Sequence, residues 1–159
     1  GDQTAFLLRL AAALHRCQLD LEVTVAADTW GPELQSAAPG WQLVTARDQM
    51  PALMAEADLA LAGAGTTCWE LAFMELPSLL VVLAANQRQN AELLHQRRAA
   101  INLGWHEDLD YQELVELIQR LQASKEERLA LVRQGGRRLV DGAGVDRVLT
   151  WLWPSPPSA

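Results

Sequence analysis

The chain contains little cysteine and no long apolar run. Its two cysteines, Cys17 and Cys68, lie far apart and lack the spacing of a zinc site or a disulfide framework. We therefore expect reduced thiols packed in a protein core, with no metal bound by the cysteines. No stretch approaches the roughly 20 apolar residues that a membrane span requires, and no signal-peptide pattern is present. These absences predict a soluble, cytoplasmic protein.

Positive charge is also scarce. There are 13 basic and 20 acidic side chains, which give a formal net charge of −7. Surfaces that bind nucleic acid or anionic membranes depend on summed positive charge, so neither partner is expected. Half of the 159 residues are hydrophobic, which favours one packed domain over residues 1–153. The Pro-rich end, residues 154–159, is expected to be a disordered tail.

Short apolar segments alternate with segments of helical periodicity along the chain. Strands are expected at residues 21–26, 41–45, 58–62, 78–83 and 99–103. Helices are expected at residues 4–16, 50–56, 67–75, 89–97, 111–122, 125–134 and 145–153. This alternation predicts an α/β fold, a Rossmann-like parallel sheet flanked by helices on both faces. A doubly wound domain normally opens on a strand and a glycine turn, so we interpret the chain as a fragment whose first strand is missing.

The first polar loop follows the third expected strand. Gly63-Ala64-Gly65 leads directly into a helix, an arrangement that points unpaired backbone N–H groups at an anion. Gly65, Thr66 and Thr67 are predicted to donate to a diphosphate, and Glu70 to accept from two ribose hydroxyls. A structural alternative is equally consistent with the spacing, because Thr67 and Glu70 also form the pattern of a capping box.

The second polar loop follows the next strand. Asn86, Gln87 and Arg88 come directly after it, and amides suit sugar hydroxyls whereas the planar guanidinium of arginine suits phosphate. The alternative is an ordinary helix start with Asn86 as its N-cap. Because the carboxyl ends of neighbouring parallel strands meet at one edge of the sheet, the two loops are expected to lie side by side.

Other conspicuous residues are interpreted structurally. The three histidines are scattered and lack ligand spacing. The Gly135-Gly136 pair follows a helix instead of a strand, which favours a helix break over a phosphate loop. Trp151 and Trp153 are expected to anchor the terminal helix to the core.

Together, these motifs resemble a known family. The quoted loops, with Leu76-Pro77-Ser78-Leu79, residues 99–104 and the closing 139–148 segment, are similar to the C-terminal half of GT-B nucleotide-sugar enzymes. The resemblance is to glycosyltransferase family 28, and within it to the UDP-sugar hydrolases of pseudaminic acid biosynthesis and the related spore-coat polysaccharide proteins. It spans nearly the whole chain.

The resemblance implies that a UDP-sugar is bound as substrate between this domain and an N-terminal domain of the same full-length protein. It implies no metal and no cofactor. Glu70 would bind the ribose, Gly63 and the residues from Gly65 to Thr67 the diphosphate together with Arg88, and the turn Ala46-Arg47 would border the uracil. Asn86 and Gln87 would face the sugar and the reacting centre. Without the N-terminal domain, the chain is expected to catalyse little by itself. An alternative of another class is a non-catalytic α/β module used for association.

Overall fold

The computed structural model describes residues 3–27, 31–132 and 135–153, so the predicted tail at 154–159 lies outside the described residues. Its strands are β1 (Thr24–Ala26), β2 (Gln42–Val44), β3 (Ala60–Gly63), β4 (Ser78–Val82) and β5 (Ile101–Trp105). All the strand pairs of the described residues are parallel, as the sequence predicts. They form two separate sheets in the described ranges, with the orders β1-β2 and β3-β4-β5, where one sheet was expected.

Helices fill most of the remaining described chain. They are α1 (Gln3–Arg16), α2 (Pro32–Ala37), α3 (Met50–Glu56), α4 (Thr67–Phe73), α5 (Arg88–Gln96), α6 (Tyr111–Ala123), α7 (Lys125–Ala130), α8 (Gly136–Leu139) and α9 (Gly144–Leu152), with 3-10 turns η1 (Arg47–Gln49) and η2 (Ala85–Gln87). Helix α8 was not predicted, because its two glycines were interpreted only as a break. Helix α2 lies outside the expected helix ranges, and α7 ends at Ala130, four residues earlier than expected. The remaining helices lie where the sequence places them, to within a few residues at their ends.

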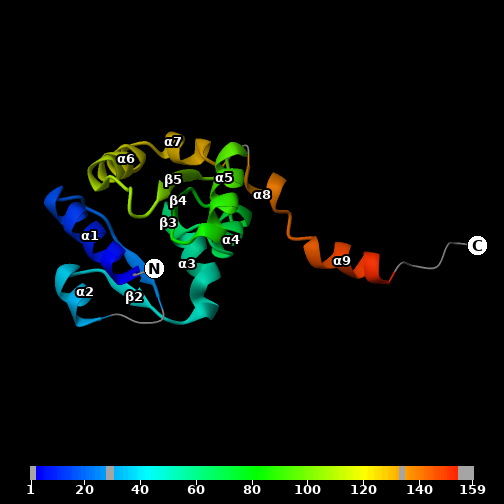
Figure 1. Ribbon diagram of the computed structural model, residues 1–159, viewed down its shortest axis with the longest axis horizontal. Coiled ribbons are helices and arrows are strands. Elements are labelled where there is room, and N and C mark those ends of the chain that lie inside the picture. Colours follow the sequence, from blue (N-terminus) through cyan, green and yellow to red (C-terminus); the bar gives the residue numbers. More distant parts are fainter. Residues whose placement is uncertain (1–2, 28–30, 133–134, 154–159) are drawn as a thin grey trace, which may run out of the picture.

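The three-stranded sheet is packed on both faces, which gives the three-layer arrangement of an α/β domain (Figure 1). Every residue of β4 is buried, as expected for the middle strand of a parallel sheet. Leu79 belongs to a cluster with the apolar faces of α1 and α6. Its neighbour Leu80 points to the opposite face and clusters with Cys68 of α4 and Leu94 of α5. Successive side chains of β4 therefore pack against the helices on opposite faces of the sheet.

Two glycines allow the chain to pack closely after α7. A methyl group on Gly135 would lie 2.5–2.6 Å from the backbone and Cβ of Ala99, and one on Gly136 would lie 2.8 Å from the Glu75 side chain. Gly135 and Gly136 are buried, and α8 packs against α4. The glycine pair is thus explained by close approach as well as by the break in the helix.

Helix α9 projects away from the domain (Figure 1). None of its residues is buried, and Trp151 is 80 % exposed. Trp153, directly after the helix, is 79 % exposed. The prediction that these two tryptophans anchor the helix to the core is therefore wrong. The amphipathic pattern identified the helix correctly, but it carries no information about which surface covers the apolar face.

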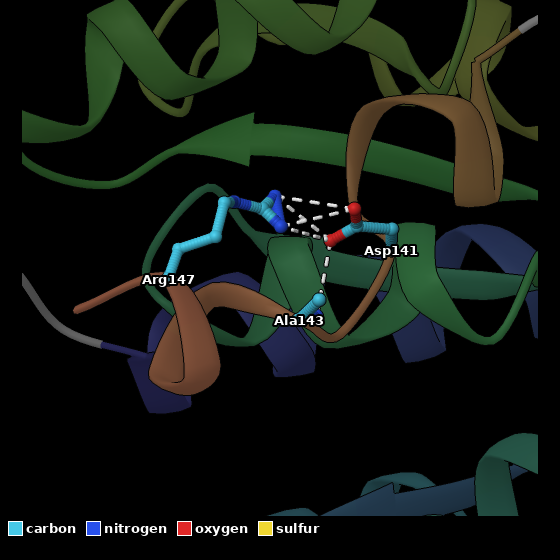
Figure 2. A network of polar contacts seen from close by, with 3 residues as sticks. All are labelled: Asp141, Ala143 and Arg147. Carbon is cyan, nitrogen blue, oxygen red and sulfur yellow. Dashed lines mark hydrogen bonds and ion pairs between the residues drawn. The ribbon is translucent and has the colours of Figure 1, made fainter. Parts of the chain in front are cut away.

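A local ion pair joins α9 to the segment before it. Asp141 accepts hydrogen bonds from the Ala143 backbone at 3.0 Å and from both terminal nitrogens of Arg147 at 2.9–3.2 Å (Figure 2). Both charged side chains are more than half exposed, so the pair adds little to stability. It explains the spacing of Asp141 and Arg147 as a structural contact at the start of α9.

Candidate functional site

The loop between β3 and α4 leaves three consecutive backbone donors without an acceptor. Ala64 still belongs to the sheet, because its N–H donates to Val81 O at 3.0 Å. The N–H groups of Gly65, Thr66 and Thr67 donate no hydrogen bond to any residue in the described ranges. Thr66 is exposed, whereas Gly65 and Thr67 are half-buried. The loop therefore offers the row of backbone donors that the sequence predicts for an anion.

The alternative interpretation of this loop, a capping box, is not formed. Thr66 occupies the N-cap position of α4 and its side chain makes no capping hydrogen bond. Thr67 is already the first helical residue. Glu70 is exposed in the first turn, and its carboxylate has no hydrogen bond or ion pair with a described residue. The carboxylate thus remains available for an external donor.

Cys68 binds the backbone carbonyl of Gly65 in the loop between β3 and α4. Its Sγ donates to Gly65 O at 2.7 Å, and its backbone N–H reaches the same oxygen at 3.2 Å. The Cys68 side chain is buried, and this burial raises the pKa of the thiol to about 11, with nearby backbone hydrogen bonds opposing the shift. The thiol is therefore protonated at neutral pH and acts here as a hydrogen-bond donor that fixes the loop.

The second polar loop lies directly against the first, as predicted. Gln87 Oε1 accepts from the Leu83 backbone N–H at 2.9 Å, which holds the side chain across the carboxyl end of β4. A methyl group added to Gly63 would lie 3.8 Å from Gln87 Oε1, and one added to Gly65 would lie 3.7 Å from Gln87 Nε2. With its oxygen already engaged, Gln87 presents only its NH₂ donors to the glycine loop.

A residue that the sequence prediction missed completes the junction between the two loops. Asn90, in the first turn of α5, donates from Nδ2 to Ala64 O at 3.1 Å. Asn90 lies two residues after Arg88, the last residue of the predicted second loop. Its partner is a backbone oxygen 26 residues away, and no spacing rule identifies such a contact.

Asn86 and Arg88 lie at the outer side of this junction. Asn86 is exposed in η2, and the predicted alternative that it caps the helix is wrong, because Gln87 occupies the N-cap position of α5. The Arg88 guanidinium carbon lies 4.8 Å from the centroid of the Trp105 ring. Arg88 and Trp105 are two of the residues that line an open groove of about 470 Å³ between α5 and β5. A contact between Arg88 and a diphosphate stays a prediction.

The turn assigned to the base belongs to the other sheet. Ala46 is half-buried and precedes η1, and Arg47 is the first residue of that turn, after the carboxyl end of β2. Gly63, Gln87 and Asn90 belong instead to the three-stranded sheet and the segments that follow it. The position of Ala46 and Arg47 beside a uracil ring stays a prediction.

The described residues contain no group of three His, Cys, Asp or Glu side chains that could hold a metal ion. Among the described helices, none has both the length and the apolar character needed to cross a membrane.

The parallel strands, the flanking helices and the donor-rich loop at the carboxyl ends of β3 and β4 define an α/β domain with a candidate anion and sugar site. Residues 25–139 match the family described as "Glycosyltransferase family 28 C-terminal domain", and the chain belongs to this family. The predicted resemblance to the C-terminal domain of glycosyltransferase family 28 is thereby confirmed.

A curated relative supports the same assignment. The chain is 31 % identical over 114 residues to "Spore coat polysaccharide biosynthesis protein SpsG" of Bacillus subtilis (strain 168). The alignment covers 72 % of this chain and 33 % of the relative, so the chain spans about a third of the relative's length.

Proposed function

We propose that this domain binds the nucleotide part of a UDP-sugar, as the donor half of a nucleotide-sugar hydrolase or glycosyltransferase. The observation that carries the proposal is the row of unpaired N–H groups at Gly65, Thr66 and Thr67, followed one turn later by the unpaired Glu70 carboxylate. Amide donors at the start of a helix suit a diphosphate, and a carboxylate accepts from the two hydroxyls of a ribose. Membership of the glycosyltransferase family 28 C-terminal domain family supports this assignment.

The second loop would complete the contacts to the ligand. Gln87 Nε2 faces the glycine loop and supplies a further donor for the diphosphate or the sugar. Asn86, which is exposed beside it, suits the hydroxyl or acetamido groups of the sugar. Arg88 would add a positive charge once its guanidinium turns from Trp105 toward the phosphates.

The chemistry assigned to these residues is stabilisation of a leaving group. In the hydrolase reaction, water attacks the anomeric carbon, the bond from that carbon to the diphosphate oxygen breaks, and UDP departs with the bonding electrons. Donors held in place before the reaction lower the energy of the negative charge that develops on the diphosphate. An amide side chain cannot remove a proton from water, so neither Asn86 nor Gln87 acts as the general base. We assign that base to the N-terminal domain of the full-length protein.

The biological setting follows from the relative. SpsG is named for spore coat polysaccharide biosynthesis, which favours a role for the full-length protein in surface polysaccharide biosynthesis. A role in nonulosonic acid biosynthesis is the alternative, and it rests on the sequence resemblance alone. Nucleotide sugars are produced inside the cell, so this setting implies a cytoplasmic enzyme. Without the N-terminal domain, this chain is expected to bind UDP weakly.

Titration with UDP tests the proposal, by isothermal calorimetry and by the amide chemical shifts of Gly65 to Thr67. Glu70→Ala should weaken UDP binding at least tenfold, because the ribose hydroxyls lose their acceptor. It should also abolish the preference for UDP over 2′,3′-dideoxy-UDP. Glu126→Ala on α7, a matched removal of one exposed carboxylate, should bind as the parent does.

Absence of any shift near Gly65 or Glu70 at millimolar UDP would contradict the proposal and would favour the non-catalytic association module. If the parent chain bound UDP and the dideoxy nucleotide equally well, Glu70 would not bind the ribose. The proposed contact of Gly65, Thr66 and Thr67 with the diphosphate would be unaffected.

A further inference from the structure

The open groove between α5 and β5 lies on the far side of α5 from the candidate nucleotide site. Asn90 turns toward the glycine loop, where its Nδ2 donates to Ala64 O at 3.1 Å. Positions 90 and 92 lie about 200° apart around a helix, so Glu92 points the other way. Glu92, Leu93 and Gln96 are exposed and line the groove, whose volume is about 470 Å³. Helix α5 therefore separates two sites.

The helix wall of the groove presents hydrogen-bond acceptors. Gln96 Nε2 donates to Glu92 Oε1 at 2.7 Å, which holds the two side chains together. The second carboxylate oxygen of Glu92 and the Oε1 of Gln96 accept no hydrogen bond from any residue in the described ranges. Both atoms can only accept. This wall therefore offers two acceptors to a ligand.

The opposite wall presents donors beside an aromatic ring. Asn102 Oδ1 already accepts from Gly104 N at 2.9 Å, so Asn102 offers the groove only its NH₂ donors. The Arg88 guanidinium carbon lies 4.8 Å from the centroid of the Trp105 ring. Trp105 Nε1 donates to Glu107 Oε2 at 3.1 Å, which fixes the ring. The groove thus has donors and an apolar platform facing the acceptors of α5.

The outer edge of β5 is closed to an added peptide strand. In the described ranges, β5 ends the order β3-β4-β5. Asn102 N donates to His95 Nδ1 at 3.4 Å, and Gly104 N donates to Asn102 Oδ1. A peptide that pairs with a sheet edge needs free backbone donors there. Because side chains of this chain occupy both N–H groups, an extended peptide is a poor occupant of the groove.

We propose that the groove between α5 and β5 binds a neutral saccharide chain. A sugar hydroxyl both donates and accepts, so it can bridge the acceptors of Glu92 and Gln96 and the donors opposite them. The C–H face of a sugar ring is apolar and packs on the Trp105 ring. An anion would meet the carboxylate of Glu92, and a cation would meet Arg88. The volume falls in the range of roughly 300–1,000 Å³ that is typical of small-molecule sites.

The saccharide site goes beyond the proposed function and does not depend on it. Arg88 belongs to the groove in the position that the structure gives it, on the Trp105 ring. The UDP proposal uses Arg88 only after its guanidinium has turned away. The variants that test the groove therefore leave Arg88 unchanged, so that a failure of one proposal is distinguishable from a failure of the other.

NMR titration of the full chain with maltotriose and with triacetylchitotriose tests the site. The indole N–H of Trp105 and the side-chain NH₂ of Asn102 should shift and saturate at millimolar saccharide. The indole N–H groups of Trp151 and Trp153 serve as internal controls, because both rings are about 80 % exposed and lie outside the groove. They should not shift.

The double variant Glu92→Ala with Gln96→Ala removes the acceptors and keeps residues that favour a helix. It should weaken saccharide binding at least tenfold and leave the UDP response of residues 65–67 as in the parent. Gln112→Ala with Glu116→Ala is the matched control on α6. It removes the same kind of exposed pair, in which Gln112 Nε2 donates to Glu116 Oε1 at 2.9 Å, and it should bind saccharide as the parent does.

Three results would overturn the proposal. The first is that neither saccharide shifts the Trp105 indole at millimolar concentration. The second is that Trp151 and Trp153 shift as much as Trp105, or that both double variants weaken binding equally. The third is that UDP-N-acetylglucosamine shifts Trp105 and the free saccharides do not, because the groove would then hold the sugar of the nucleotide. Saccharide binding without UDP binding would leave this site standing and contradict the proposed function.

Discussion

Asn90 Nδ2 donates a hydrogen bond to Ala64 O at 3.1 Å and so fastens the start of α5 to the loop that follows β3. Ala64 belongs to the loop between β3 and α4, and Asn90 to the first turn of the helix that follows the next βα loop. Gln87 is fixed within the second loop by the hydrogen bond that its Oε1 accepts from Leu83 N, and its side chain lies beside Gly63 and Gly65. The geometry of the unpaired N–H groups at Gly65 and beyond therefore depends on side chains of the neighbouring loop.

Replacing Asn90 with alanine should loosen this junction. Loss of one partly buried side chain to backbone hydrogen bond costs about 1 kcal/mol, since Ala64 O would lose its partner. The free energy of unfolding in urea should fall by that amount, and UDP affinity should fall with it. Gln89→Ala, at an exposed neighbouring position of the same helix, should change neither quantity. Unchanged UDP affinity in Asn90→Ala would show that the junction does not position the loop.

Gly135 should tolerate no side chain. An added methyl group would lie within 2.6 Å of the Ala99 backbone, which cannot move aside as a flexible side chain can. Gly135→Ala should therefore lower the free energy of unfolding by about 1–3 kcal/mol or more. Gly144→Ala is the matched control, because a methyl group there meets no atom within 4 Å and alanine favours the helix. Equal stability of the two variants in urea would contradict the close approach.

The raised pKa of the Cys68 thiol predicts that the folded protein loses stability at high pH. The unfolded thiol ionises near its ordinary pKa of 9.0, whereas burial raises the folded pKa to about 11. The stabilisation that comes from the protonated folded thiol is therefore complete below pH 9. It declines as the pH rises toward 11, because the unfolded state has already released its proton.

Cys68→Ser isolates this contribution. Serine keeps a donor for Gly65 O and does not ionise in this range. The stability difference between parent and Cys68→Ser, from urea unfolding, should shrink between pH 8 and pH 10.5. The pKa of Tyr111 is also raised by burial, but this residue is present in both proteins, so its effect cancels in the difference. A constant difference over this range would mean that the folded thiol ionises at its ordinary pKa.

The parts of the fold that the sequence predicted are those set by local pattern. The alternation of apolar runs and amphipathic segments located each strand and most helices, since period and length are properties of neighbouring residues. The position of the glycine loop beside the Asn86–Arg88 loop followed from parallel topology alone. Contacts across the fold were missed, because the bond from Asn90 to Ala64 O joins residues whose proximity only the folded sheet creates.

The errors have the same origin. Gly135 and Gly136 were interpreted as a helix break because they follow a helix, whereas the close approach of Ala99 and Glu75 explains why no side chain fits there. The two C-terminal tryptophans were expected to anchor the terminal helix, but both are exposed. The exposure of Trp151 and Trp153 shows that a hydrophobic pattern identifies an apolar face, but does not identify the surface against which that face packs.

Removal of α9 should leave the stability of the domain unchanged. The helix has no buried residue, and its exposed ion pair between Asp141 and Arg147 contributes little. A chain ending at Ala143 should therefore unfold within about 0.5 kcal/mol of the parent in urea. Leu94→Ala, which opens a cavity at a fully buried position of α5, should cost about 2–5 kcal/mol in the same assay. Because the truncation also removes exposed Val145, Trp151 and Leu152, it should reduce self-association measured by sedimentation. A loss of stability close to that of Leu94→Ala would mean that α9 packs against the domain in solution.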